Sequence, residues 1–582
     1  MNVAELLVKL AAKWSVRHCF MVTGGMAMYI NKAISEESEI GTTFVHHEQA
    51  AICAAEGWVK ASGFKSIGLA CVTAGPGVTN SITGLVAAYG DSVPILILAG
   101  QVKTQDINTL DLRTHGIQEV NSKSLVTPAV KKFVRIEYEK LLEQVKGIEE
   151  ALLSGRNGPV FVEIPLDIQS MEVSPKLVEF LNEDTKIESE EAEPKLMSLV
   201  NTLRILTSEN KRIGVVIGNG LRIAGVNYPE LFAILKSQNI PTFFTWLSLD
   251  LYEFNEENNM GCPGGFASTH SNSTLQECEV VIFLGARIDL ATSAFQREKY
   301  GARGSRVFID IDHRELEKFT RKSDYKFCID LKDCFGEIKS FFASVTVDED
   351  WAKEIVLRKS QSLIKEEKKL ATKELSVRNV ALAVSRHLNN GVLVSASSGV
   401  AEEIFTRFLR PNGKFRFFNS AALGAMGQGL SHGIGSAIQR SGDETPVLIF
   451  EGDGGLWMHV HELATVAQEK LRNFHLFVLN NKGYASIRNS QINHFKYTFG
   501  CDSDSGLFIP NYSQIAAMFG FRYIEVTKPE ELSEDFFSRI FTDQSCNLID
   551  LKVSLVEEVG PKLKTILKDG RPTTEDFGDL GW

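Results

Sequence analysis

The chain has 582 residues, well beyond the roughly 250 to 300 residues that one hydrophobic core normally supports, so we expect several domains. Its composition is that of an ordinary globular protein, with 44% hydrophobic and 23% charged residues. A formal net charge of -11 argues against nucleic acid or an anionic membrane as the main partner. The nine cysteines are scattered singly, which supports neither a disulfide framework nor a zinc site and indicates a reducing, cytoplasmic location.

The opening segment, residues 3–14, predicts an amphipathic helix. Its apolar residues have helical spacing and do not form the continuous run of a signal peptide. No segment approaches about 18 uninterrupted apolar residues, so we expect no membrane-spanning helix.

Short β-rich runs alternate with helical patterns along the whole chain, which is typical of α/β domains with parallel sheets. We expect three doubly wound parallel-sheet domains, over residues 1–181, 194–347 and 374–582. The acidic stretch 182–193 is predicted to be a solvated linker. The charged segment 353–373 is predicted to be a helical crossover between the second and third domains.

Two glycine-rich turns follow strands in the third domain. The first is Gly452-Asp453-Gly454, and the second is Asn480-Asn481-Lys482-Gly483. Both should lie at the carboxyl edge of one sheet, where open α/β sheets bind ligands. A carboxylate, an amide oxygen and a backbone carbonyl are the hard donors that Mg²⁺ prefers. We therefore predict that Asp453, Asn481 and the Gly483 carbonyl hold Mg²⁺, while the glycines let the backbone approach a diphosphate.

A Gly-Asp-Gly sequence alone is commonly just a turn, but here 25 residues separate it from Asn-Asn-x-Gly. That combination resembles the signature of thiamine diphosphate enzymes. The resemblance implies thiamine diphosphate as cofactor and a set of residues around its diphosphate: Ser397, Ser398, Gly399, Gly452, Asp453, Gly454, Gly455, Asn481, Gly483 and Tyr484.

The first domain resembles the pyrimidine-binding domain of the acetolactate synthase family, through His46 to Ala50, Thr73 to Asn80 and Asp91 to Pro94. The resemblance implies Glu48 as the catalytic acid. Its chemistry requires a carboxyl group, because the cofactor's aminopyrimidine must change tautomer before the thiazolium ring can lose a proton. Without these neighbours Glu48 would be interpreted as a capping or ion-paired carboxylate. Further cofactor contacts implied in this domain are Gly24, Gly25, Pro76 and Asn80.

Other site residues follow from the same resemblance. In the segment Ala421 to Gly427, Met426 would wedge the cofactor into its bent form and Gly424 would offer its carbonyl to the aminopyrimidine, although an isolated Met is usually core filler. Gln118 and Lys131 are expected as polar contacts in the catalytic site. Family members combine two subunits at each cofactor, which implies a homodimer or homotetramer.

The central domain resembles the family's FAD-binding region at five positions: Gly218, Gly220, Gly285, Arg287 and Asp310. A lone Gly-x-Gly is a weak signal. Two interpretations stay open, a bound structural FAD and a domain that has lost its nucleotide.

The resemblance implies decarboxylation of a small 2-keto acid, pyruvate, and transfer of the two-carbon unit to a carbonyl acceptor. Ser490 stands where acetolactate synthases carry Trp, so the acceptor site should be wider or more polar. The main alternative acceptor is a nucleotide-linked keto-sugar in branched-sugar synthesis. A flavin-dependent pyruvate oxidase and an inactive regulatory homologue are alternatives from other classes, and intact Glu48, Asp453 and Asn481 argue against the inactive homologue.

Overall fold

The computed structural model describes residues 1–180, 193–209, 211–442, 445–543, 545–557, 560, 563, 565–568 and 571–575. The expected linker 182–193 lies outside the described residues except for Glu193.

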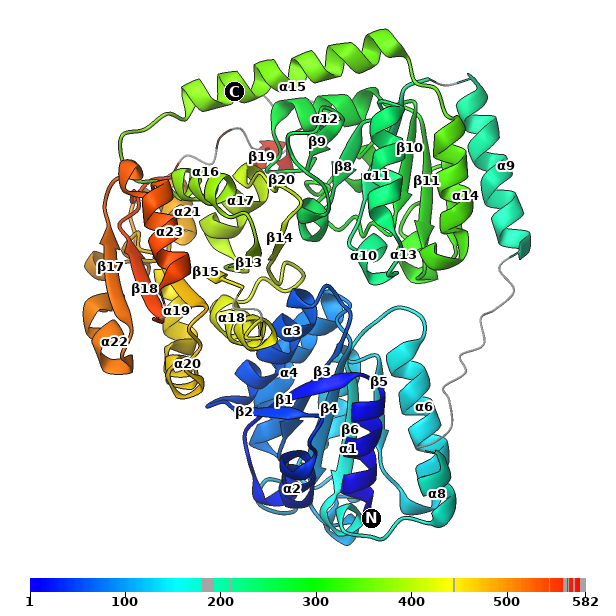
Figure 1. The fold of residues 1–582 in the computed structure, drawn as a ribbon, viewed down its shortest axis with the longest axis vertical. Helices are drawn as coiled ribbons and strands as arrows, with labels where there is room; N and C mark the ends of the chain where they lie inside the picture. The colour runs from blue at the N-terminus through cyan, green and yellow to red at the C-terminus, as the bar shows by residue number, and fades with distance from the viewer. Residues whose placement is uncertain are drawn as a thin grey trace.

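Three six-stranded sheets, each with all its strands parallel, form the three lobes seen in Figure 1. The predicted fold, three α/β domains with parallel sheets, is confirmed. The strands of the first sheet are β1 (Val16–Met21), β2 (Gly41–Phe44), β3 (Ile67–Val72), β4 (Ile95–Gln101), β5 (Lys132–Arg135) and β6 (Val160–Pro165). Its strand order is β2-β1-β3-β4-β6-β5. The central strands are continuous apolar runs because helices cover both faces of the sheet.

The second sheet has the strand order β12-β11-β10-β7-β8-β9, which is the doubly wound order of dinucleotide-binding domains. From β7 the chain adds strands outward to β9, and from β10 it adds them outward in the opposite direction to β12. The switch point of this sheet therefore lies between the neighbouring strands β7 and β10. Its strands are β7 (Ile213–Ile217), β8 (Thr242–Phe244), β9 (Asn259–Gly261), β10 (Val280–Leu284), β11 (Ser305–Asp310) and β12 (Asp324–Cys328).

The third sheet, ordered β14-β13-β15-β16-β18-β17, repeats the connectivity of the first. Its switch point lies between β13 and β15. Its strands are β13 (Gly391–Ser395), β14 (Phe415–Phe418), β15 (Val447–Gly452), β16 (Phe474–Leu479), β17 (Arg522–Val526) and β18 (Asn547–Leu551). A separate antiparallel hairpin is formed by β19 (Thr565–Lys568) and β20 (Arg571–Thr574).

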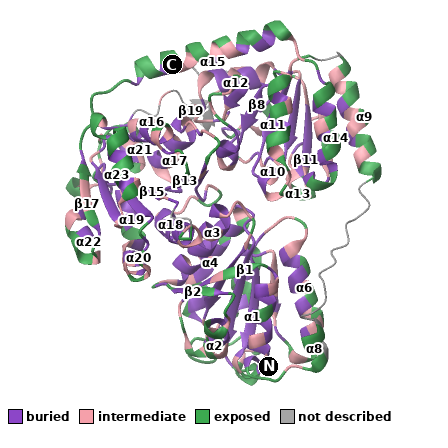
Figure 2. Ribbon diagram, viewed as in Figure 1, coloured by how far each residue is buried: buried purple, intermediate pink, exposed green. Residues whose placement is uncertain are grey.

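Helices cover the sheets, as the buried strands between more exposed helices in Figure 2 show. Those of the first lobe are α1 (Val3–Lys13), α2 (Met28–Glu36), α3 (Glu48–Ala61), α4 (Pro76–Gly90), α5 (Ser122–Val126), α6 (Leu141–Leu153), α7 (Leu166–Gln169) and α8 (Pro175–Phe180). Those of the second are α9 (Glu193–Glu209), α10 (Gly220–Ile223), α11 (Tyr228–Ser237), α12 (Thr269–Glu277), α13 (His313–Glu317) and α14 (Leu331–Ser344). The third lobe has α16 (Val377–His387), α17 (Gly399–Phe408), α18 (Gln428–Gln439), α19 (Asp453–His459), α20 (Leu463–Glu469), α21 (Ala485–Phe495), α22 (Tyr512–Phe519) and α23 (Glu534–Thr542).

The crossover helix expected over residues 353–373 is α15 (Glu349–Lys369), which runs along the top of Figure 1 from the second lobe toward the third. One continuous apolar cluster joins these two lobes. It includes Leu249 and Leu251 of the second lobe and Phe415 and Phe417 of the third.

Helices α3 and α18 pack directly against each other between the first and third lobes (Figure 1). Their contact depends on glycine: a Cβ on Gly57 would lie 2.1 Å from the His432 carbonyl oxygen, and one on Gly435 would lie 1.8 Å from the Ala54 carbonyl oxygen. Position 57 therefore meets 432 and position 54 meets 435, so the backbones of the two helices are in direct contact. This contact joins the first lobe to the third.

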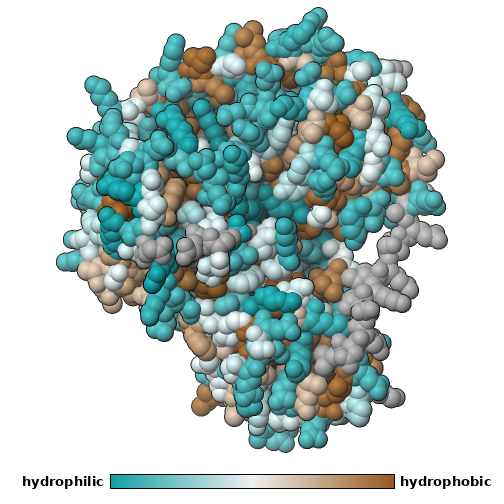
Figure 3. All heavy atoms as spheres, in the orientation of Figure 1, coloured by the Kyte–Doolittle hydropathy of each residue, from teal (hydrophilic) through white to brown (hydrophobic). Residues whose placement is uncertain are grey.

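The face of the molecule drawn in Figure 3 is mainly hydrophilic, with hydrophobic side chains scattered over it. Among the described residues, no helix combines the length and the apolar character needed to cross a membrane.

Candidate active site

A cavity of about 330 Å³ lies at the carboxyl ends of β13, β15 and β16. It includes the switch point of the third sheet, where ligands of open α/β sheets bind. Most third-domain residues that the sequence assigned to the cofactor line this cavity: Ser398, Gly399, Gly424, Met426, Gly452, Asp453, Gly454, Gly455, Asn481, Gly483 and Tyr484. The strand-to-turn pattern thus brought together residues that are up to 86 positions apart in the chain (484 minus 398).

Asp453 joins the turns after β15 and β16. Its Oδ1 accepts a hydrogen bond from the Gly454 N–H at 2.8 Å and its Oδ2 one from the Gly483 N–H at 2.9 Å. Burial raises the pKa of Asp453 to about 6, even though these backbone donors lower it. The buried Asn481 Oδ1 has no hydrogen-bond partner within the described part of the chain. A cation between these oxygens would satisfy both groups.

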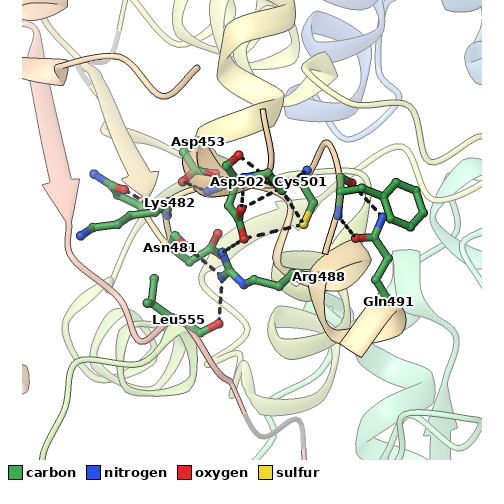
Figure 4. Close-up of polar contacts among 12 residues, drawn as sticks. Asp453, Asn481, Lys482, Arg488, Gln491, Cys501, Asp502 and Leu555 are labelled. Carbon is green, nitrogen blue, oxygen red and sulfur yellow. Dashed lines mark hydrogen bonds and ion pairs between the residues drawn. The ribbon is translucent and has the colours of Figure 1, made fainter. Parts of the chain in front are cut away.

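Arg488 on α21 holds the Asn481 turn, as Figure 4 shows. Its Nη2 donates to the backbone carbonyls of Asn481 and Leu555, each at 2.9 Å, and its Nη1 lies 3.8 Å from an oxygen of Asp502. The arginine side chain is 9% exposed. Arg488 was not predicted from the sequence, because one arginine on a helix carries no pattern that points to a buried turn.

Two glycines of the cavity are required by its geometry. A Cβ on Gly454 would lie 2.0 Å from the ring of Tyr484, so the aromatic side chain packs directly on the backbone there. Gly483 has a φ of +139°, a conformation that L side chains rarely adopt, and a Cβ there would also lie 2.1 Å from the Cys501 carbonyl oxygen.

Glu451 is a second carboxyl group in the cavity wall, and it was not predicted from the sequence. It is buried, and its Oε2 has no hydrogen-bond partner among the described residues. Burial raises the pKa of Glu451 to about 8, against the lowering effect of backbone N–H groups such as that of Gly452. Its place as the next-to-last residue of β15 gave no sequence signal, because strand residues alternate between faces.

Glu48 begins α3 and is 8% exposed. Its Oε2 accepts a hydrogen bond from the Asn80 Nδ2 at 2.9 Å, so these two expected site residues are in contact. Gln118 lies beside the same turn: it has a φ of +63°, and a Cβ on Gly75 would meet its Cα at 2.7 Å. Glu48, Asn80 and Gln118 therefore surround the turn that leads into Pro76.

Other expected residues lie apart from these groups. The Ser397 Oγ accepts a hydrogen bond from the Ser420 N–H at 3.0 Å, and Ser397 does not line the cavity. Lys131 donates from Nζ to the Ser154 carbonyl at 2.5 Å, and burial lowers its pKa to about 8. Gly24 packs on Thr73, where a Cβ would lie 2.4 Å from the Thr73 Cβ, whereas a Cβ on Gly25 would meet nothing within 4 Å.

Glu48 does not line the cavity of its own chain. All the residues that line it belong to the third lobe, between Val377 and Ile487. The Glu48 carboxyl group instead contacts Asn80 of its own lobe. The cavity of one chain therefore lacks the first-lobe half of the expected site.

A second cavity, of about 240 Å³, lies at the switch point of the central sheet. Gly220, Gly285, Arg287 and Asp310 line it, as expected for a nucleotide site. Gly218 lies beneath it, since a Cβ there would be 2.0 Å from the Gly285 carbonyl oxygen. Burial raises the pKa of Asp310.

Comparisons with known proteins agree with this architecture. The family models of the thiamine pyrophosphate (thiamine diphosphate) enzymes match the N-terminal TPP binding domain at residues 1–125, the central domain at 199–338 and the C-terminal TPP binding domain at 397–551. The chain belongs to this family, and the resemblance stated from the sequence is confirmed.

Within the family, the chain is similar to acetolactate synthases. It is 26% identical to the acetolactate synthase large subunit of Lactococcus lactis over 565 residues, which are 96% of this chain and 94% of that protein. It is 26% identical to isozyme 3 large subunit of Escherichia coli, covering 96% of both chains, and 28% identical to acetolactate synthase 3 of Brassica napus, covering 91% and 80%. The chain is thus a thiamine diphosphate-dependent enzyme of the acetolactate synthase type.

Proposed function

We propose that this enzyme decarboxylates a 2-keto acid, pyruvate in the first instance, and joins the two-carbon unit to a carbonyl acceptor. The observation that carries the proposal is the cavity in which Asp453 and the unpartnered Asn481 Oδ1 face the glycine-rich turns. The likeness to acetolactate synthases over more than nine-tenths of the chain supports pyruvate as the donor.

The residues of the cavity fit Mg²⁺ and a diphosphate. Asp453 and Asn481 offer side-chain oxygens and Gly483 a carbonyl, which is a ligand set that suits Mg²⁺ together with phosphate oxygens. Ser398 and Gly399 stand at the start of α17, where backbone N–H groups and the helix dipole favour an anion. Met426 and Ile487 are apolar residues of the cavity wall.

The two halves of the site come from different subunits in this proposal. Glu48 does not line its own chain's cavity, so Glu48 of the partner subunit would complete each site. This requires at least a homodimer, and a homotetramer would satisfy it equally.

When bound, thiamine diphosphate supplies the electron sink that takes up the electron pair left by departing carbon dioxide. The protein's part is to hold the group and move protons. The Glu48 carboxyl group would exchange a proton with the pyrimidine, and Asn80 keeps that carboxyl group oriented through its hydrogen bond. Gln118 and Lys131 are proposed as polar contacts of the catalytic site, with Gln118 placed beside the Glu48 turn.

Ser490 favours a second candidate acceptor, a nucleotide-linked keto-sugar. Ile487 lines the cavity, and exposed Ser490 lies one helical turn further along α21. A small hydroxyl side chain there leaves the mouth of the cavity open to an acceptor larger than a second pyruvate.

The central cavity is proposed as a nucleotide site, with FAD as the ligand to test. Gly220 and Gly285 allow close backbone approach, Arg287 can meet phosphate, and Asp310 at the end of β11 offers a carboxylate that can accept hydrogen bonds from ribose hydroxyls. Its volume of about 240 Å³ is below the roughly 300 to 1,000 Å³ of ligand pockets, which suits the adenosine portion better than a whole dinucleotide.

The test is proton NMR of the purified protein with pyruvate, Mg²⁺ and thiamine diphosphate, with and without FAD. Formation of acetolactate would support pyruvate as acceptor. Slow pyruvate loss that accelerates only with a nucleotide-linked keto-sugar would support the second candidate. Bleaching of bound FAD by pyruvate would replace the proposal with a flavin oxidase, and cofactor binding without any substrate loss would indicate an inactive homologue.

A further inference from the structure

A buried junction joins the first lobe to the loop that leads into the active-site cavity of the same chain. Asp91 follows the last residue of α4 and is 3% exposed. Its Oδ2 lies 2.7 Å from the Lys60 Nζ, and its Oδ1 accepts a hydrogen bond from the Ala422 N–H at 3.2 Å. The Lys60 Nζ also donates to the Asn419 carbonyl at 2.7 Å. Two side chains of the first lobe thus hold two backbone groups of residues 419–422.

The neighbouring residue, Gly90, sets the distance between the lobes. A Cβ on Gly90 would lie 2.6 Å from the Ala422 Cβ, and the next nearest atom would be the Ala422 Cα at 3.9 Å. Glycine at this position therefore permits the approach that the Asp91 hydrogen bond to Ala422 requires.

The central lobe meets the same junction. Arg287 donates from Nη1 to the Gly90 carbonyl, and its Nη2 lies 3.5 Å from the Asp91 Oδ1. Arg416, at the strand before the loop, donates from Nε to the Lys60 carbonyl at 2.9 Å. All three lobes therefore contact one another through Gly90, Asp91 and Lys60.

From Ala422 the chain reaches the cavity within four residues. Gly424 and Met426 line the cavity, while Ala421 lines the central cavity instead. Gly424 has a φ of +66°, so the backbone turns sharply there. A Cβ added to Gly424 would lie 3.2 Å from the Ser397 carbonyl oxygen. A displacement at Ala422 would be transmitted to Met426, because few bonds separate them.

We propose that Gly90 and Asp91 are positioning residues that set the Asn419–Met426 loop for cofactor binding. This inference rests on the proposed function, since it takes the cavity as the thiamine diphosphate site. Each first lobe then has two roles: it positions the cofactor loop of its own chain, and its Glu48 serves the partner subunit.

The direct test is Gly90→Ala with its matched rescue, Gly90→Ala/Ala422→Gly, which removes the methyl group that the new Cβ would meet. For Gly90→Ala we expect the thiamine diphosphate Kd, measured calorimetrically with Mg²⁺, to rise about tenfold, and kcat to fall roughly tenfold to a hundredfold. The double variant should recover both values, and the near-UV circular dichroism of bound cofactor should follow the same pattern. Melting of the cofactor-free proteins reports any general loss of stability.

A second variant, Asp91→Asn, keeps the shape of the side chain but weakens its hydrogen bond to Ala422 and its pairing with Lys60. The same rise in Kd is expected with an unchanged KM for pyruvate, because the residue does not touch substrate. The Glu56 Oε1 still lies 2.6 Å from the Lys60 Nζ, so the buried lysine keeps a carboxylate partner. This partner limits the loss of folding stability in Asp91→Asn.

The outcomes separate the two proposals. If the wild-type protein binds no thiamine diphosphate, the proposed function is wrong. If it binds and Gly90→Ala binds equally tightly and turns over normally, the positioning role is wrong. The role is also wrong if Ala422→Gly fails to rescue a folded Gly90→Ala protein, since the effect would then not pass through Ala422.

Discussion

The Oδ2 of Asp453 accepts a hydrogen bond from the Gly483 N–H at 2.9 Å, which ties the turn after β15 to the turn after β16. The two strands are parallel neighbours, so their carboxyl ends are already adjacent. This bond adds a fixed spacing between Asp453 and the Asn481 turn, as a metal site with near-octahedral demands requires.

Asp453→Ala should abolish Mg²⁺-dependent binding of thiamine diphosphate, because it removes a proposed metal ligand and also releases the Gly483 turn. Calorimetric titration of the cofactor with Mg²⁺ and with EDTA measures this. Asp333→Ala, an exposed aspartate on α14, is the matched control and should titrate like the wild-type protein. An unchanged titration of Asp453→Ala would remove Asp453 from the metal site.

Arg488→Lys should weaken Mg²⁺ affinity by roughly tenfold to a hundredfold, the usual effect of losing a residue that orients a metal ligand. Lysine cannot span both the Asn481 and Leu555 carbonyls as the planar guanidinium does. The measurement is the Mg²⁺ dependence of cofactor binding at saturating thiamine diphosphate. Exposed Arg539→Lys on α23 serves as a control. Equal Mg²⁺ affinities for Arg488→Lys and the wild-type protein would contradict this role.

Glu48→Gln should bind the cofactor and lose turnover by roughly a hundredfold or more, which is the usual contribution of a general acid-base group. The variant keeps a hydrogen-bonding side chain next to Asn80 but cannot exchange the proton. Steady-state kinetics and a cofactor titration together check this prediction. Full activity in Glu48→Gln would rule out the assigned proton transfer.

Mixing Glu48→Gln and Asp453→Ala subunits should restore activity that neither variant has alone. In a mixed dimer one site combines both lesions and the other combines intact Glu48 with intact Asp453. Co-expression with two different affinity tags isolates the mixed species for assay. An inactive mixed dimer would show that both groups act within one chain, against the proposed sharing of each site between two subunits.

Glu402 on α17 should make stability depend on pH. Burial, followed by the nearby carboxylates of Glu403, Asp91 and Asp289, raises the pKa of Glu402 from 4.5 to about 9. The folded state then keeps a proton that the unfolded chain loses, so stability falls as pH rises from about 4.5 to about 9. The upper limit is about 1.4 kcal/mol per pH unit.

Comparison of urea unfolding at pH 6 and pH 8 measures this dependence without added cofactor. Glu402→Gln should be less sensitive to pH than the wild-type protein, since an amide mimics the protonated carboxyl group at both values. Exposed Glu349→Gln on α15 should keep the wild-type dependence. A wild-type slope retained in Glu402→Gln would show that other groups cause it.

Local patterns in the sequence predicted much of the fold. The pattern over Glu48 to Ala61 is typical of a helix and corresponds to α3, and the apolar runs at 280–284 and 474–479 correspond to β10 and β16. These segments are predictable because apolar periodicity and flanking glycines are local properties of the chain. The turn residues Asp453 and Asn481 were predicted for the same reason: each directly follows a recognisable strand.

Other residues had no local signature. Arg488 and Glu451 matter through what they contact after folding, and each is an isolated charged residue in the sequence. The Lys60–Asp91 pair likewise joins residues 31 positions apart and then reaches the carbonyl of Asn419 in another lobe. Only long-range packing determines such contacts.

The sequence by itself determined the family, the three parallel-sheet domains and the cofactor chemistry, because strand-turn patterns and short motifs lie within contiguous segments. Only the tertiary structure decided that every residue lining the cavity lies in the third lobe and that Asp91 contacts the loop before Met426. Both relationships depend on how the first lobe packs on the third, and contacts between residues far apart in the chain set that packing.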